Sequence, residues 1–416
     1  MIDYSEALAI IQRHAQRLPV QRCAPRVGHV LAEPVASAED LPPFDNSAMD
    51  GFALHSGGVS VVAGSEFDVV GAQAAGDVAT CGSGVFEIMT GARLPDGLDT
   101  VVPVEQVEVL AQDGAGRPQR IRLLADAEPE QHVRLRGEDV GAGTPVLAAG
   151  SRLEAAQLML LAALGVAEVA VSAVPKVAVL NTGRELVDDP AQALASGEIR
   201  NSNGPYLAAR LRDAGAEVVL RETVSDDAEA FLAALARALD AGAEMVLSTG
   251  AVSMGRYDFV PDALRSLGAT LHFHKVKIRP GKPLLFASLP GGQLFFGLPG
   301  NPVSSAVGLR FFVEPALRAM TGLPQERPLQ LPLAAAFKKR LPLRFHLKGR
   351  LEVDAGGKLQ ARVLPGQESF RIQPLLQANC WIVVDEAMQA PQAGDLVEVY
   401  GLGHLLAPAI ESVVTR

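Results

Sequence analysis

The chain has 416 residues, is 48% hydrophobic and carries a formal net charge of −10. This length predicts about two to four domains, and the negative charge argues against nucleic acid or an anionic membrane as a partner. The three cysteines form no CxxC pair, so we expect neither a disulfide framework nor a zinc site. The N-terminal residues do not resemble a signal peptide, and the best apolar run, residues 158–167, is too short to cross a bilayer. The sequence therefore predicts a cytoplasmic protein without a membrane partner.

The first part of the chain combines helical and β-type patterns. Apolar residues at helical spacing follow Ser5 and predict an N-terminal helix that ends near Pro19. Short β-type runs, interrupted by glycine, proline and aspartate, predict a β-rich domain over residues 42–136. Residues 153–164 are apolar at almost every position and predict a buried helix. We expect this helix to pack on the N-terminal helix, so that the two flanking segments form one discontinuous domain, residues 1–41 and 137–173.

Residues 174–323 alternate between strand and helix patterns. This alternation, with short connections, predicts a central three-layer α/β/α domain with a mostly parallel sheet. Short strands between turns predict a small C-terminal β barrel over residues 324–416. The fold class predicted is therefore a multidomain α/β and β protein. In the α/β domain we predict strands at residues 177–180, 217–220 and 245–247, and helices at residues 203–214, 226–241 and 257–267.

Three glycine-containing polar loops follow apolar runs in this domain, at residues 248–258, 275–283 and 297–302. Ligands of parallel sheets bind beyond the carboxyl ends of the strands, where such loops lie. Glycine lets backbone N–H groups approach an anion, and a carboxylate such as Asp258 suits a hard divalent cation. The loops therefore predict a phosphate-like ligand held together with a metal ion.

The second loop concentrates positive charge. Alternation places Lys275, Lys277 and Arg279 on one face of a strand, and Lys282 follows within a glycine turn. Such a row can be a solvated strand edge. Several positively charged side chains beside a glycine turn, however, favour anion binding. Because the chain as a whole is negative, a polyanionic ligand has to be captured by a local patch of this kind.

Three carboxylates follow strands of the same predicted sheet. Taken singly, Glu185 reads as a solvated loop residue, and Asp226 and Asp258 read as helix caps. Together on one sheet edge they would repel one another unless a cation lies among them. Neither of the familiar glycine-rich motifs for dinucleotides or P-loops occurs, so the predicted site is of another kind.

Several short segments carry a resemblance to a known family, and they span the whole chain. In the order in which they occur, they resemble the MoeA family of molybdopterin molybdenumtransferases, which includes the gephyrin E domain. The matching segments are residues 43–51, 88–91, 137–139, 182–186, 225–227, 248–258, 280–283 and 297–304.

The resemblance implies an enzyme of molybdenum cofactor biosynthesis. Such an enzyme takes molybdenum from molybdate, its substrate, and inserts it into adenylylated molybdopterin with release of AMP, using Mg²⁺ as the cofactor. The resemblance also implies a homodimer in which the α/β domain of one subunit and the β-rich domain of the other share an active site. It allows one protein partner, a molybdopterin adenylyltransferase. A non-catalytic pterin-binding or scaffold protein, and a tungsten-inserting paralogue, are the alternatives.

The resemblance also implies roles for individual residues, which we take over as expectations. Arg184, Ala251 and Arg279 depart from the family pattern, which has an acidic residue, a glycine and a lysine there. Expected catalytic residues are Asp50, Glu185, Asp226, Asp258 and Lys275, and the expected metal ligands among them are Glu185, Asp226 and Asp258. Expected substrate-binding residues are Thr90, Arg134, Asp139, Ser248, Gly250, Ser253, Arg279, Lys282, Pro299 and Asn301.

Overall fold

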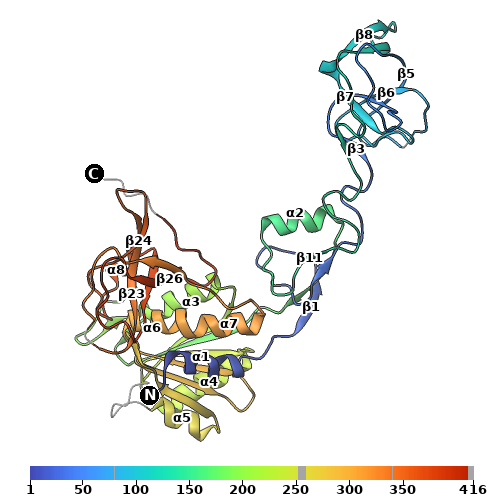
Figure 1. The fold of residues 1–416 in the computed structure, drawn as a ribbon. Helices are drawn as coiled ribbons and strands as arrows, with labels where there is room; N and C mark the ends of the chain where they lie inside the picture. Colours follow the sequence, from blue (N-terminus) through green and yellow to red (C-terminus); the bar gives the residue numbers. More distant parts are fainter. Residues whose placement is uncertain (79, 252–258, 340, 411–416) are drawn as a thin grey trace. The chain divides into compact units, whose positions relative to one another are not determined.

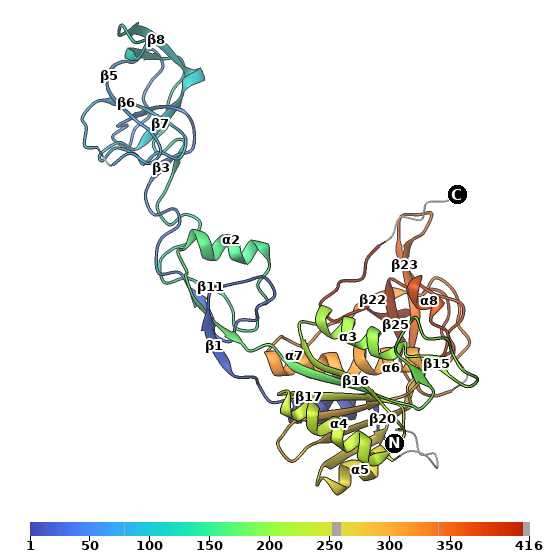
Figure 2. The same ribbon diagram turned by 180° about the vertical axis from the view of Figure 1, so that it is seen from behind.

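The computed structural model describes residues 1–78, 80–251, 259–339 and 341–410 (Figures 1 and 2). The chain forms two compact units, of which the larger contains residues 1–21, 28–32 and 170–416. The smaller unit contains residues 22–27 and 33–169. Within the described ranges, no helix has the length and apolar character that a membrane span requires.

The larger unit is built on a six-stranded sheet, formed by β13 (Lys176–Thr182), β16 (Glu217–Val224), β17 (Met245–Thr249), β18 (Thr270–Lys275), β20 (Pro283–Ser288) and β21 (Leu294–Leu298). The strand order is β16-β13-β17-β21-β20-β18. Neighbours from β16 to β21 are parallel, whereas β20 runs antiparallel to both β21 and β18. Strands β13, β17 and β21 are buried almost throughout, as expected for strands covered on both faces.

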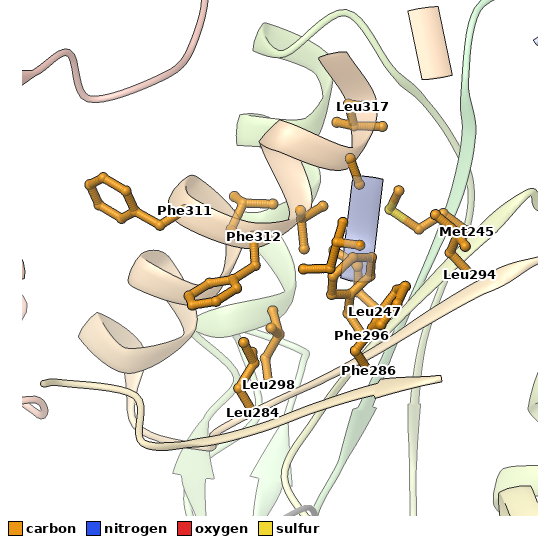
Figure 3. Packing of buried hydrophobic residues seen from close by; sticks show 14 of the residues in the cluster. Met245, Leu247, Leu284, Phe286, Leu294, Phe296, Leu298, Phe311, Phe312 and Leu317 are labelled. Carbon is orange, nitrogen blue, oxygen red and sulfur yellow. The ribbon is translucent and has the colours of Figure 1, made fainter. Parts of the chain in front are cut away.

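Helices cover both faces of this sheet. They are α1 (Tyr4–His14), α3 (Asn203–Asp213), α4 (Ala228–Asp240), α5 (Val260–Ser266), α6 (Pro302–Gly308) and α7 (Glu314–Thr321), with the π-helical segment η2 (Leu309–Val313) between the last two. On one face α1, α3, α6 and α7 share a core with Val179 and Leu247. Figure 3 shows part of this core, with Leu284 and Leu298 of the sheet facing Phe312. On the other face α4 and α5 pack on Leu180 and Val246.

The position of α1 differs from the sequence prediction. Ala7 and Ile11 are fully buried in the core beneath α7, which α1 contacts directly. The sequence grouped this helix with residues 137–173, most of which lie in the smaller unit. An amphipathic stripe shows that a helix has an apolar partner but does not identify it, and here the partners are α7 and the sheet.

A second sheet of six strands lies in the C-terminal part of the larger unit. It consists of β19 (Ile278–Arg279), β22 (Leu329–Pro332), β23 (Arg344–Val353), β24 (Leu359–Val363), β25 (Cys380–Val384) and β26 (Leu396–Tyr400). Strand β19 comes from the loop after β18 and pairs parallel with β23. The short helix α8 (Gln373–Leu376) precedes β25, and a parallel pair, β14 (Leu186–Val187) and β15 (Ile199–Arg200), precedes α3. Because β19 belongs to this sheet, residues 275–279 do not form one continuous strand.

The smaller unit is β-rich. Its main sheet has the order β7 (Thr100–Pro103), β4 (Gly51–Leu54), β6 (Val85–Ile88), β5 (Glu66–Gln73), β9 (Pro118–Leu123) and β8 (Val107–Gln112), and the turn η1 (Val104–Gln106) follows β7. Phe52, Leu54 and Ile121 form part of its core. Gly51 is required where β4 meets β7, because a Cβ atom there would lie 2.0 Å from the carbonyl oxygen of Val102.

Short strand pairs bring distant segments together. Strand β2 (Val35–Ala36) pairs with β11 (Pro145–Leu147), and Leu41 bridges Val140. Strand β3 (Asn46–Ser47) pairs with β10 (Val133–Arg134), and β1 (Val20–Cys23) pairs with β12 (Val169–Ser172). The chain therefore returns alongside its own early residues, between residues 20 and 47 and residues 133 and 172.

The helix predicted over residues 153–164 is α2 (Ala155–Ala163), which begins with a capping box between Glu154 and Gln157. Leu161 is its one buried residue, and the Met159 side chain is 73% exposed. The prediction of a buried helix is therefore wrong. A helix that is apolar on every side gives no indication of which side has a neighbour in the folded chain.

Candidate active site

The carboxyl ends of five strands of the central sheet meet at one edge. Strands β16, β13, β17 and β21 are parallel, so the loops that follow them emerge together. Strand β18 ends at the same edge, because Lys275 is paired with Pro283, where the antiparallel β20 begins. The loops that carry Glu185, Asp226 and Asn301 therefore emerge at this edge, and Lys275 ends the outermost strand, β18, at the same edge.

Glycines let these loops approach one another closely. Gly250 has φ +89, and a Cβ atom there would lie 2.5 Å from the carbonyl oxygen of Thr182. Its N–H donates to the carbonyl oxygen of Leu298 at 3.2 Å, so this amide serves the fold and not a ligand. The next residue, Ala251, has φ 49, a backbone conformation that glycine adopts with less strain.

Two adjacent carboxylates after β16 have different tasks. Asp227 caps α4, since its carboxylate accepts a hydrogen bond from the Ala230 N–H at 2.8 Å. Asp226 instead accepts one from the Arg184 N–H at 3.3 Å, which places its carboxylate beside the loop after β13. In that loop the Glu185 carboxylate oxygens lie 2.8 Å from where a Cβ atom on Gly183 would be. Asp226 and Glu185 therefore belong to the same corner of the sheet edge.

The predicted third carboxylate, Asp258, lies outside the described residues, as does Ser253. Within the described part of the chain, no three His, Cys, Asp or Glu side chains are placed to hold a metal ion. Mg²⁺ is usually bound through one or two carboxylates together with substrate phosphates and water. Glu185 and Asp226 could bind Mg²⁺ in this way. The Asp226 side chain is exposed, the Glu185 side chain is half-buried, and the two come from adjoining loops.

The cations of the second loop do not form one row. Lys277 pairs with Asp3 at 2.8 Å, and this hydrogen bond raises the pKa of Lys277. Arg279 lies in β19, with its guanidinium 5.4 Å from the centre of the Phe345 ring. Lys275 stays at the end of β18, half-buried. The prediction that these three side chains share a face is wrong, because the chain leaves one sheet after Lys275 and enters another.

A cavity of about 650 Å³ opens beside Arg279. No site residue was expected in the C-terminal strands. A single charged residue on a short strand does not predict a binding site from sequence. The pairing of β19 with β23 brings several such residues to one cavity. The charged and amide side chains that line the cavity with Arg279 are Lys338, Arg362, Gln367 and Glu368.

The remaining predicted residues of the larger unit have mixed positions. Ser248 is fully buried within β17, where its side chain cannot meet a ligand from solvent. The carbonyl oxygen of Pro299 accepts a hydrogen bond from the Ser305 hydroxyl. The next carbonyl, of Gly300, accepts one from the Asn203 side chain at 2.8 Å. Asn301 and Lys282 are exposed in their loops.

The smaller unit holds a second group of predicted residues. The Asp50 carboxylate accepts hydrogen bonds from the Thr90 N–H at 2.6 Å and the Thr90 hydroxyl at 2.9 Å. These bonds, that of the N–H first, lower the pKa of Asp50. Arg134 lies in β10, where its strand partner is Asn46, which also bridges Arg93. Among the described residues, the exposed Asp139 makes no side-chain hydrogen bond to any of them, and its N–H bonds to Leu41.

Thr90→Val tests this arrangement. The variant keeps the N–H donor but loses the hydroxyl, so we expect the pKa of Asp50 to rise towards its usual value. Because a depressed carboxyl pKa adds stability above the unfolded-state pKa and loses it as pH falls, the acid end of the stability profile should weaken. An NMR titration of the Asp50 carboxyl measures the shift. Ser65→Ala, in the same unit, is the control, and an unmoved Asp50 titration in Thr90→Val would contradict the assignment.

Comparison with known proteins assigns the chain to a family. Its first part, residues 2–165, matches the "MoeA N-terminal region (domain I and II)". Residues 178–319 match the family model described as "Probable molybdopterin binding domain", and residues 330–402 match the "MoeA C-terminal region (domain IV)". An open α/β sheet with polar loops at its carboxyl edge defines a ligand-binding α/β protein of several domains.

Individual relatives agree over nearly the whole length. A protein named molybdopterin molybdenumtransferase from Synechococcus elongatus is 38% identical, covering 97% of this chain and 100% of the relative. One of the same name from Staphylococcus aureus strain COL is 32% identical over 96% of this chain and 95% of its own. The crystal structure of a molybdopterin biosynthesis moeA protein from Pyrococcus horikoshii OT3 superimposes with a TM-score of 0.79, at 26% identity, over 96% of this chain and 100% of that one. The chain belongs to the MoeA family.

Proposed function

We propose that this protein is a molybdopterin molybdenumtransferase of molybdenum cofactor biosynthesis. It takes molybdenum from molybdate, inserts it into adenylylated molybdopterin and releases AMP. The observation that carries this proposal is the 38% identity to a relative of that name, over 97% of this chain and the full length of the relative. The loops at the carboxyl edge of the sheet support it, because they combine carboxylates and a cation where α/β proteins bind ligands.

The side chains at this edge suit a substrate with a pyrophosphate link. Lys275 would meet phosphate or molybdate oxygens as they gain charge, and the resemblance assigns the same anions to Arg279 and Lys282, which lie in the segment after β18 and not at the sheet edge itself. Glu185 and Asp226, with Asp258 outside the described residues, would hold Mg²⁺. The bound ion would neutralise charge on the phosphate oxygens when the adenylate leaves. Asp226 is further placed by the Arg184 N–H, which holds its carboxylate towards the loop of Glu185.

The protein is proposed to act as a homodimer with shared active sites. In this arrangement Asp50, Thr90 and Arg134 of one subunit would complete a site whose other residues are Glu185, Asp226 and Lys275 of its partner. The resemblance to the family and the separation of these two groups into different units of the chain support it. Delivery of the adenylylated substrate by an adenylyltransferase, and a cytoplasmic location, remain predictions.

The activity can be tested with purified protein, adenylylated molybdopterin, Mg²⁺ and either molybdate or tungstate. We expect AMP release together with formation of the molybdenum cofactor when molybdate is present. Product with tungstate but not with molybdate would identify a tungsten-inserting enzyme. No AMP release with either oxyanion, from folded protein that still binds molybdopterin, would favour the non-catalytic alternative and overturn the proposal.

Lys275→Ala should weaken substrate capture. Loss of a charge-assisted contact in a partly desolvated site is expected to raise KM by about tenfold or more. Lys358→Ala is a matched control, because Lys358 is exposed in a turn of the C-terminal part. Steady-state kinetics over a range of substrate concentrations measures both variants, and equally small changes in KM would rule out this role for Lys275.

A further inference from the structure

In two neighbouring strands of the central sheet, the core-facing side chains change from apolar to polar at paired positions. On the face covered by α3, β13 presents Val177 and Val179 to the core and then Asn181. Strand β17 presents Leu247 on that face and then Thr249, its partner in register. Asn181 and Thr249 are 0% and 2% exposed. Because buried polar groups cost free energy, apolar residues would be expected to continue both rows.

The two polar side chains bond to each other. The Asn181 amide nitrogen donates to the Thr249 hydroxyl oxygen at 2.6 Å, and the Thr182 hydroxyl donates to the carbonyl oxygen of Thr249 at 3.0 Å. The Asn181 oxygen has no hydrogen-bond partner among the described residues. It lies 2.5 Å from where a Cβ atom on Gly204 would be, so the first turn of α3 packs directly on it. The ends of β13 and β17 are thus fastened together beneath the candidate active site.

This bond lies directly beneath two of the loops at the sheet edge. Thr249 is followed by Gly250, whose N–H bonds to Leu298 and whose backbone passes against Thr182. Thr182 in turn begins the loop that carries Glu185. Moving Thr249 would therefore change the direction in which the chain leaves β17 relative to the loop that carries Glu185.

We propose that Asn181 is a positioning residue for the transferase reaction. Acting through Thr249, it fixes the backbone at Gly250, where the chain leaves β17, against the loop that carries Glu185, and so sets the geometry in which substrate is held. This inference rests on the proposed function and extends it to residues that touch no ligand. A purely structural role is the alternative. Stability alone does not require the pair, because replacing both partners of a buried hydrogen bond with apolar groups of similar shape is close to neutral.

Three variants separate the two roles: Thr249→Val, Asn181→Leu and the double replacement. Thr249→Val leaves the Asn181 amide buried without its acceptor, so its Tm should fall by several degrees. The double variant should recover a Tm near that of the unaltered protein. Its kcat should nevertheless stay at least about tenfold reduced, with KM changed less, because reacting groups are displaced while contacts with the rest of the substrate remain. Thr249→Ser, which keeps the hydroxyl, should retain activity.

A second measurement needs no turnover. Hydrogen exchange of the peptide that contains the Gly250 amide should be about tenfold faster in the double variant than in the unaltered protein, while residues 177–180 exchange equally slowly in both. Thr321→Val is the control, since among the described residues the Thr321 hydroxyl bonds to carbonyl oxygens of α7 itself. If the unaltered protein proves inactive, the proposed function fails, but this exchange experiment still decides whether Asn181 positions the loop. Activity that returns together with Tm in the double variant, or unchanged exchange at Gly250, would overturn the proposal.

Discussion

Asp226→Ala should reduce kcat by about a hundredfold or more while the protein stays folded. Asp226 is exposed, and among the described residues its one hydrogen bond comes from the Arg184 N–H, so little packing is lost. Removing a carboxylate that holds a metal ion or orients its water removes electrostatic stabilisation made in the transition state. AMP release at saturating Mg²⁺ measures the effect. The same loss is expected for Asp258→Ala, at a position outside the described residues.

The neighbouring residue provides a sharp control. Asp227→Ala removes the cap of α4 and should cost about 1 kcal/mol of folding free energy, with turnover almost unchanged. Asp226→Asn keeps an acceptor for the Arg184 N–H but loses the charge, so it should be nearly as inactive as Asp226→Ala. Turnover close to normal in Asp226→Ala, or an equal loss of turnover in Asp227→Ala, would show that Asp226 has no special chemical role.

Mixed dimers should recover activity that neither parent homodimer has. Assayed at a substrate concentration far below KM, where the raised KM of Lys275→Ala limits the rate, Asp50→Ala and Lys275→Ala homodimers are each expected to be nearly inactive if every site uses Asp50 of one chain and Lys275 of the other. A dimer containing one chain of each kind has one intact site of two. Random assembly gives about half such dimers, so total activity should return to roughly a quarter of the unaltered level.

Co-expression of the two chains with different affinity tags makes this test clean, because a large interface exchanges slowly once formed. The isolated mixed dimer should then have about half of normal activity. A chain carrying both substitutions, co-expressed with the Lys275→Ala chain, is the control and should remain inactive, since neither chain then supplies Lys275. Mixed dimers that form but show no activity, or an active monomer, would refute the shared-site proposal.

Much of the central sheet was predictable from sequence. The helices predicted at residues 203–214, 226–241 and 257–267 correspond to α3, α4 and α5, and residues 257 and 258 of the third prediction lie outside the described residues. The prediction succeeded because strands buried on both faces appear as uninterrupted apolar runs. The segments between them have apolar residues at helical spacing, which predicts helices. The packing partners of α1 and the exposure of α2 were not predictable from sequence. Both depend on which surfaces of the folded chain lie next to each helix.

The sequence allowed a prediction of which loops carry the candidate site, but not of the hydrogen bonds that its side chains make. The sequence predicted that Glu185, Asp226 and Lys275 lie where strands of one sheet end, and in the structure they follow or end β13, β16 and β18. The pairing of Asp226 with the Arg184 N–H, and of Asp227 with α4, follows from the direction of two adjacent side chains and has no sequence signal. The charged cavity beside Arg279 depends on a strand that crosses from one sheet into the other.

The sequence by itself determined the α/β character of the central sheet, the loops that end its strands and the membership of the MoeA family. These features are encoded locally, in apolar runs, glycines and short motifs that keep their meaning wherever the segment lies. The tertiary structure alone decided that Lys277 is neutralised by Asp3, that Ser248 is buried and that Asn181 bonds to Thr249. Such facts depend on contacts between residues far apart in the chain, whose geometry is set only when the sheets and helices have packed.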